Sequence, residues 1–168
     1  LGTSASSGPY WGSLQPDRLA EHLVSRVVTD RPDLLTSLFT ATSPDQDHQA
    51  LTVLTRASAT YAALGPILEN LLVEVPGLAL PAIGVATQSE HPSPLVTALT
   101  KLILGDHLSV DHLALIADAL PQQTQSLALF AARLQLRIAS AFQQMALQDR
   151  ATYYPRFAWA AKIGRAHV

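Results

Sequence analysis

Prolines mark the beginnings of successive segments along this chain, and their positions restrict what it can fold into. Seven of the eleven prolines stand at the start of a stretch with helical periodicity. Proline is tolerated in the first turn of a helix, where the backbone N–H has no partner, but it interrupts the hydrogen bonds of a helix interior or a central strand. No apolar–polar alternation long enough for a strand lies between them, so an all-α fold is predicted. These seven prolines are Pro16, Pro32, Pro44, Pro66, Pro81, Pro94 and Pro121.

Apolar residues between these prolines recur at the spacing of amphipathic helices. Ser43 and Ser109 are expected to cap two helices, because a serine hydroxyl accepts a hydrogen bond from a free N–H of the first turn. The segment 78–87 is apolar almost all round and also fits a buried strand, but no other segment offers it a β partner. The predicted architecture is an irregular stack of antiparallel helical hairpins, with right-handed layering like that of tetratricopeptide or HEAT repeats. The expected helices span 16–28, 32–41, 44–58, 61–75, 78–87, 95–104, 109–120 and, as one long C-terminal helix, 122–148.

The apolar stripes also predict which side chains form the core. The first helix carries its stripe as adjacent pairs, with Ser25 on the opposite side: Leu19 and Ala20, Leu23 and Val24, Val27 and Val28. The second helix is expected to bury Leu34, Leu35, Leu38 and Phe39. The long helix is expected to bury Leu127, Phe130, Ala131, Leu134, Ile138, Ala141, Phe142 and Met145. A truncation at the far end of that stripe, Phe142→Ala, is expected to cost about 3–5 kcal/mol of stability.

The composition excludes several classes of function. The net charge of −2 gives no basic face for nucleic acid. No apolar run approaches the roughly 18 residues that a membrane-spanning helix needs. The chain has no cysteine, which fits a reducing, cytoplasmic compartment. Charged residues make up 14% of the chain, well below the roughly 25% of an average domain, so neighbouring protein segments are expected to cover part of its surface.

Four segments are expected along the chain. Residues 1–14 are a linker, because the first nine are rich in glycine and serine. Residues 15–150 form an α-helical coupling domain, and 151–162 begin a truncated tetratricopeptide-like repeat. Residues 163–168 match the translation of a common sequencing adapter and are expected to be non-native.

No catalytic, cofactor-binding or metal-binding set is predicted. The chain has neither a phosphate loop of the G-x-x-x-x-G-K-[ST] type nor a G-x-S-x-G nucleophile turn. Three aspartates, Asp47, Asp106 and Asp111, each stand directly before a histidine. Adjacent residues on a helix point about 100° apart, so such pairs do not chelate together. Only His107 and Asp111 are one helical turn apart, and capping and solvation explain them more simply. A hydrolase or a metalloenzyme is therefore a remote alternative.

Two groups of residues are candidates for a protein interface. Arg133 and Arg137 are one turn apart on the long helix and could receive acidic groups of a partner, although a solvated face explains them as well. Aromatic residues gather at the two ends of the chain, and aromatics are enriched at interfaces. Their alternative role is local packing. These aromatic residues are Tyr10, Trp11, Tyr153, Tyr154 and Trp159.

Four stretches resemble a known family, the bacterial STAND (NB-ARC-like) signalling NTPases. They are residues 11–19 (WGSLQPDRL), 51–57 (LTVLTRA), 86–92 (ATQSEHP) and 155–160 (PRFAWA). In that family such a helical segment lies between the winged-helix region and C-terminal tetratricopeptide repeats. The resemblance implies a non-catalytic coupler whose partners are the upstream nucleotide switch and the downstream repeat sensor. The phosphate loop of the family would lie before residue 1, so no functional residue transfers to this chain. The alternative is a stand-alone peptide-binding helical repeat module.

Overall fold

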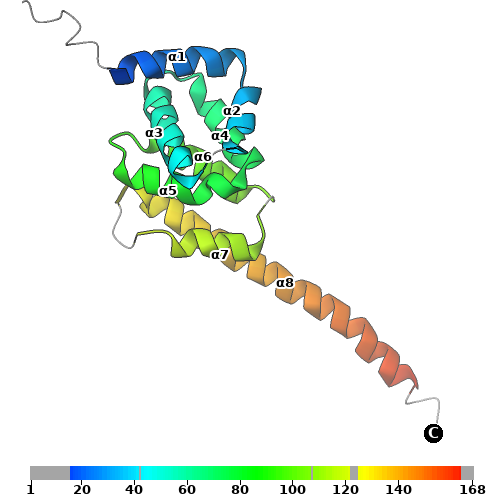
Figure 1. The fold of residues 1–168 in the computed structure, drawn as a ribbon. Coiled ribbons are helices and arrows are strands. Elements are labelled where there is room, and N and C mark those ends of the chain that lie inside the picture. Colours follow the sequence, from blue (N-terminus) through cyan, green and yellow to red (C-terminus); the bar gives the residue numbers. More distant parts are fainter. Residues whose placement is uncertain (1–15, 42, 107, 122–124, 164–168) are drawn as a thin grey trace, which may run out of the picture.

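The computed structural model describes residues 16–41, 43–106, 108–121 and 125–163, and within these ranges it contains helices and no strands (Figure 1). Side chains are described between residues 18 and 148 of these ranges. The all-α prediction is confirmed. The α-helices are α1 (Pro16–Asp30), α2 (Asp33–Phe39), α3 (Pro44–Thr60), α4 (Leu64–Glu74), α5 (Ala79–Gln88), α6 (Ser93–Leu104), α7 (Val110–Asp118) and α8 (Ala128–Ile163), with single 3₁₀ turns at Pro76–Leu78 and Gln125–Leu127.

Local start signals explain where the helices begin. Each helix from α1 to α6 has a proline at its N-cap or within its first three residues. The backbone N–H of Ser43 donates to Oε1 of Gln46 at 3.0 Å, at the beginning of α3. The Ser109 hydroxyl accepts a hydrogen bond from the backbone N–H of His112 at 3.3 Å, at the beginning of α7. Both caps predicted from the sequence are therefore confirmed as helix starts.

The core lies where α3, α4, α5 and α6 meet (Figure 1). The main contact within it is between α4 and α6, while α3 packs on α5. At one end α1 packs on α3 and α4; at the other end α8 packs on α6 and α7. The largest completely buried side chains are Leu51, Leu64, Leu68, Leu72, Leu95, Leu99, Leu102, Ile103, Leu113, Leu127, Phe130 and Leu134.

The segment 78–87 is helical, so the alternative of a buried strand is wrong. In α5 the side chains of Ile83 and Val85 and of three alanines between 79 and 86 are buried. A helix satisfies its own backbone hydrogen bonds, whereas a lone strand in a helical core would leave them unpaired. The right-handed, repeat-like layering of the hairpins stays a prediction.

Helix α1 buries only one side of its predicted apolar stripe, the side of Val24 and Val28. Leu19, Leu23 and Val27 are about half exposed, whereas Ser25 and Val28 are buried. Adjacent residues lie about 100° apart on a helix, so only one member of each apolar pair can face the core. The buried Ser25 hydroxyl is satisfied because it donates to the backbone carbonyl of His22 at 2.9 Å.

Helix α2 and the far part of α8 also bury less than predicted. Leu34 and Leu38 are exposed, while Leu35 and Phe39 on the adjoining face of α2 are buried. A helix of seven residues has one side against the body, so its four apolar residues cannot all be covered.

The apolar stripe of α8 extends beyond the helical body against which this helix packs. Phe130, Leu134 and Ala141 are buried, but every described side chain of α8 after Ala141, including Phe142 and Met145, is exposed. Beyond this point α8 leaves the other helices (Figure 1). The predicted burial of Phe142 and Met145 is therefore wrong, and a large cost of Phe142→Ala is no longer expected. The helix continues to Ile163, through the part expected to begin a separate repeat, and Pro155 lies within it.

The predicted linker at 1–14 and the predicted tail at 163–168 lie outside the described residues, apart from Ile163 as the last residue of α8. Within the described ranges, no individual helix combines the length and apolar composition needed to cross a bilayer. Helix α4 and the segment 76–88 meet that criterion only as a pair bent by 108°.

A glycine in the middle of α5 offers a test of this packing. A Cβ atom added at Gly84 would lie 3.6 Å from Cε1 of His48, which is an ordinary van der Waals contact. Alanine restricts the unfolded chain more than glycine does, so Gly84→Ala is expected to raise the free energy of unfolding by about 0.5–1 kcal/mol. Urea titration followed by circular dichroism measures this change. A loss of stability would mean that α3 and α5 pack more closely than described.

Candidate functional site: the groove between α6 and α8

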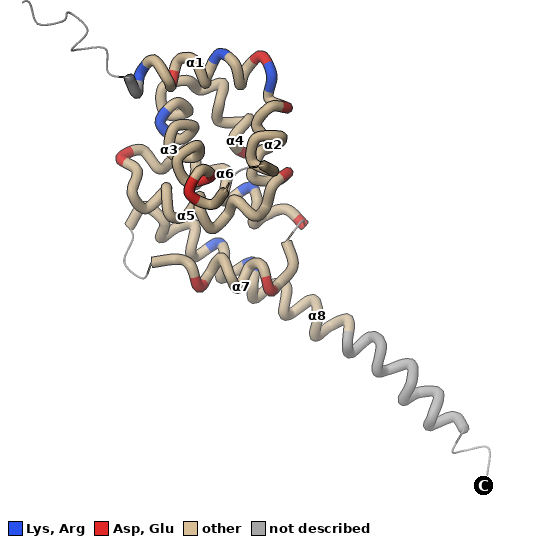
Figure 2. The backbone as a smooth tube through the Cα atoms, in the orientation of Figure 1, with Lys and Arg blue, Asp and Glu red and all other residues tan. Residues whose placement is uncertain are grey.

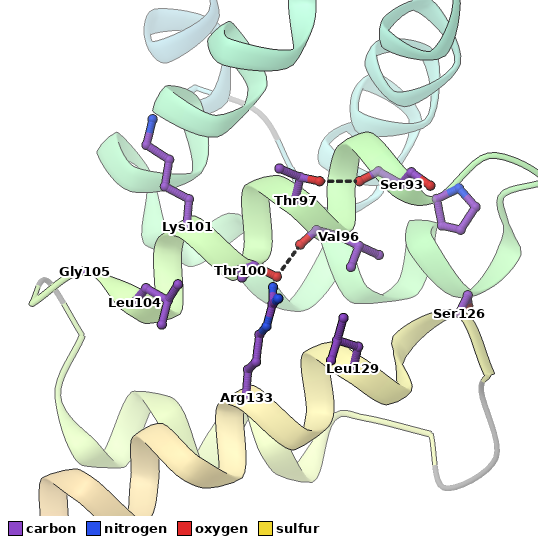
Figure 3. Close-up of a pocket in the computed structure, with 11 residues that line it drawn as sticks. Ser93, Val96, Thr97, Thr100, Lys101, Leu104, Gly105, Ser126, Leu129 and Arg133 are labelled. Carbon is purple, nitrogen blue, oxygen red and sulfur yellow. Dashed lines mark hydrogen bonds between the residues drawn. The ribbon is translucent and has the colours of Figure 1, made fainter.

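An open groove of about 850 Å³ lies where α8 crosses α6 (Figure 3). Helix α6 supplies one wall, and the 3₁₀ turn at Gln125–Leu127 with the beginning of α8 supplies the other. The lining contains two cations and no carboxylate. We call this feature the α6–α8 groove, and its lining residues are Pro92, Ser93, Val96, Thr97, Thr100, Lys101, Leu104, Gly105, Ser126, Leu129 and Arg133.

The threonine hydroxyls of the groove donate to their own helix. Thr97 Oγ1 donates to the carbonyl of Ser93 at 2.9 Å, and Thr100 Oγ1 donates to the carbonyl of Val96 at 2.8 Å (Figure 3). A hydroxyl that donates in this way keeps its oxygen lone pairs as acceptors. The wall formed by α6 therefore offers hydrogen-bond acceptors beside apolar side chains.

The two cations of the groove differ in their partners. Lys101 Nζ lies 3.1 Å from Glu69 Oε2 and 3.1 Å from Asn70 Oδ1, so its charge ties α6 to α4. Arg133 has no hydrogen bond or ion pair among the described side chains. Its side chain extends from α8 across the groove toward Thr100 (Figure 3). Among the described residues, Arg133 is thus the cation of this groove that has no acidic partner.

The structure gives the two predicted interface arginines different roles. Arg137 Nη2 lies 3.0 Å from Asp106 Oδ1, which joins α8 to the segment after α6. Only 19% of the Arg137 side chain is exposed, while Asp106 is 98% exposed. Arg133, one turn earlier on α8, is exposed and lines the groove. An incoming acidic group would therefore meet Arg133 first.

Two exposed leucines flank Arg133 in the groove. Leu104, in the last turn of α6, is 61% exposed, and Leu129, one turn before Arg133 on α8, is 65% exposed. Sequence patterns did not single out either residue as functional. For Leu129 one signal was available: it lies outside the buried stripe of its helix. A large apolar side chain on the exposed side of a helix can mark a binding surface.

A second uncovered apolar surface is the outer row of α1, which consists of Leu19, Leu23 and Val27. These residues are four apart, so they share one face of the helix. The opposite side of α1 packs on α3 and α4, at the end of the body farther from α8 (Figure 1).

Charged groups are scattered over the tube in Figure 2, and several of them lie on α1. Near the beginning of α2, Arg31 and Asp33 form an exposed pair with nitrogen–oxygen distances of 2.9 and 3.0 Å. The hydrogen bonds from Arg31 hold the pKa of the Asp33 carboxyl below its ordinary value. Arg26 lies exposed on α1.

Within the described ranges, no group of three or more His, Asp or Glu side chains lies close enough to hold a metal ion. His107, the expected partner of Asp111, lies outside the described residues. So do the aromatic candidates Tyr10 and Trp11. The other aromatic candidates are part of α8, but their side chains lie outside the described part of the chain. They are Tyr153, Tyr154 and Trp159.

No protein-family model, no curated protein and no solved structure matches this chain. The exposed faces and the groove are therefore the observations from which a function can be inferred.

Proposed function

We propose that this chain is a non-catalytic helical coupling segment of a STAND-type signalling NTPase. In this role α1 docks on the upstream nucleotide switch, and α8 leads to a downstream repeat sensor. Rigid packed helices pass a change between two sites when both sites bias the same two-state element. The resemblance of residues 11–19 to the segment after the winged-helix region supports this assignment.

The observation that carries the proposal is the presence of uncovered apolar faces at two ends of one helical body. The outer row of α1 faces solvent at one end. At the other end α8 projects beyond the body with Phe142, Met145 and Leu147 exposed (Figure 1). Removing apolar surface from water lowers the free energy by about 25 cal/mol for each Å², which favours covering such faces. We propose that neighbouring parts of one longer protein pack on these exposed faces of α1 and α8.

Hydroxyl-radical footprinting tests this arrangement in the longer protein. The side chains of Leu19, Leu23 and Val27 are expected to be oxidised in the 168-residue chain and protected in the longer protein. Their protection is expected to differ between the ADP-bound protein and the protein bound to a non-hydrolysable ATP analogue. Mass spectrometry of the proteolytic peptides measures both differences.

The matched control for this experiment is Leu115 on α7, which is also exposed but is not part of a proposed docking face. It should be oxidised equally in both proteins. Equal oxidation of the outer row of α1 in both proteins, or an upstream reading frame without a phosphate loop, would contradict the coupling role.

The α6–α8 groove favours a second candidate function, a peptide-binding helical module. Helical repeat proteins use grooves between hairpins to bind extended segments. The groove combines apolar side chains, hydrogen-bond acceptors and an arginine that has no partner among the described side chains, and these are groups that can bind a peptide. This role does not require that the chain belong to an NTPase.

A further inference from the structure

We propose that the α6–α8 groove binds an acidic peptide segment of a partner protein. An aspartate or glutamate of that segment pairs with Arg133, and aliphatic side chains next to it pack on Leu104 and Leu129. This site rests on the second candidate function, peptide binding in the groove, and specifies the chemistry of the peptide. It does not depend on the coupling role, because that role rests on α1 and the far part of α8.

The charge of the groove selects the acidic partner. Among the lining residues, Lys101 is already tied to Glu69, and none is a carboxylate. Arg133 points across the groove without a described partner (Figure 3). A guanidinium presents a planar set of donors that matches both oxygens of a carboxylate. A basic peptide would meet this positive charge with no compensating acid.

The shape and the apolar lining of the groove favour a peptide over a small molecule. Leu104 and Leu129 stand on either side of Arg133 in the view of Figure 3, so an acidic residue with aliphatic neighbours can use all three contacts. Pockets for small molecules enclose most of the ligand surface, whereas this groove is open to solvent. The hydroxyl oxygen of Thr97 lies on the wall formed by α6, where it can accept a hydrogen bond from a peptide N–H.

Selection from a random peptide library displayed on phage tests the proposal. The intact chain is expected to enrich peptides that carry aspartate or glutamate beside large aliphatic residues. The affinity of the best synthetic peptide is then measured by fluorescence anisotropy. Because a hydrogen bond to a charged group is worth roughly 1.5–3 kcal/mol, Arg133→Gln is expected to weaken binding about 10- to 100-fold. Replacing the acidic residue of the peptide by its amide should weaken binding to the same extent.

The controls separate the groove from general electrostatics. Arg26→Gln removes an exposed arginine of α1 and should leave the affinity unchanged, while Leu129→Ser should lower it. All variants alter exposed side chains, so equal melting temperatures should confirm that they fold. Failure to enrich any peptide, enrichment of basic or uncharged peptides, or equal binding by Arg133→Gln would overturn the proposal. None of these outcomes bears on the protection of the outer row of α1, which tests the coupling role separately.

Discussion

Phe130→Ala is expected to destabilise the fold by about 3–5 kcal/mol. Phe130 is 1% exposed and lies in the first turn of α8, among the side chains that join this helix to the body. Truncating it removes buried apolar surface and leaves a cavity that the neighbouring helices fill only in part. Urea unfolding followed by circular dichroism at the helix band measures the effect through the midpoint and the slope of the transition.

Phe142 provides a matched control because it is the same residue type in the same helix. It is 57% exposed, on the part of α8 beyond the body, so Phe142→Ala is expected to change stability by about 0.5 kcal/mol or less. The difference between the two variants cancels the common change in helix propensity. Equally large losses of stability for the two variants would show that the far part of α8 is packed, contrary to the structure. Equally small losses would show that Phe130 is not a core residue.

The beginnings of α1, α2, α3, α5 and α7 could be predicted to within one residue because the signals are local, whereas α8 begins at Ala128 and not at the expected residue 122. A proline in the first turn or a serine at the N-cap acts on backbone groups within a few residues of itself, whatever the rest of the chain does. The hydrogen bond from Ser43 to Gln46 and the one from His112 to Ser109 are of this kind.

The faces that the helices bury could not be predicted in the same way. In α1 each apolar position is doubled, and the stripes through Leu23 and Val24 fit a helix equally well. The choice depends on how α3 and α4 are placed against α1, which is tertiary information. The stripe of α8 is regular through Met145, but the body ends earlier, and the length of a pattern does not reveal the extent of its partner.

The candidate site was predicted only in part. The spacing of Arg133 and Arg137 indicated two equivalent cations on one face of the long helix. The structure separates them, because Asp106 follows α6 at the position where it reaches Arg137. The groove itself requires the crossing of α6 and α8, so the roles of Leu104 and Thr97 depend on a contact between segments distant in the sequence.

Leu102→Asp is expected to abolish stable folding at neutral pH. Leu102 is completely buried on α6, the helix that makes the main core contact with α4. A buried carboxylate without a partner costs several kcal/mol, comparable with the roughly 5–15 kcal/mol of an entire domain. Burial would raise the pKa of the new carboxyl in the folded chain above its unfolded value of about 3.9. The penalty therefore grows as the pH rises above about 4 and diminishes below it, so the variant should regain helix content on acidification.

Leu104→Asp is the control for this experiment, because Leu104 stands two residues later on α6 and is 61% exposed. Its carboxylate would remain hydrated, so the variant should fold at neutral pH with little change in the urea midpoint. Circular dichroism of both variants over a pH series makes the comparison. Because residues two apart on a helix face away from each other, a stable Leu102→Asp with an unfolded Leu104→Asp would mean that α6 presents the opposite face to α4. Equal stability of the two would mean that α6 is not a core helix.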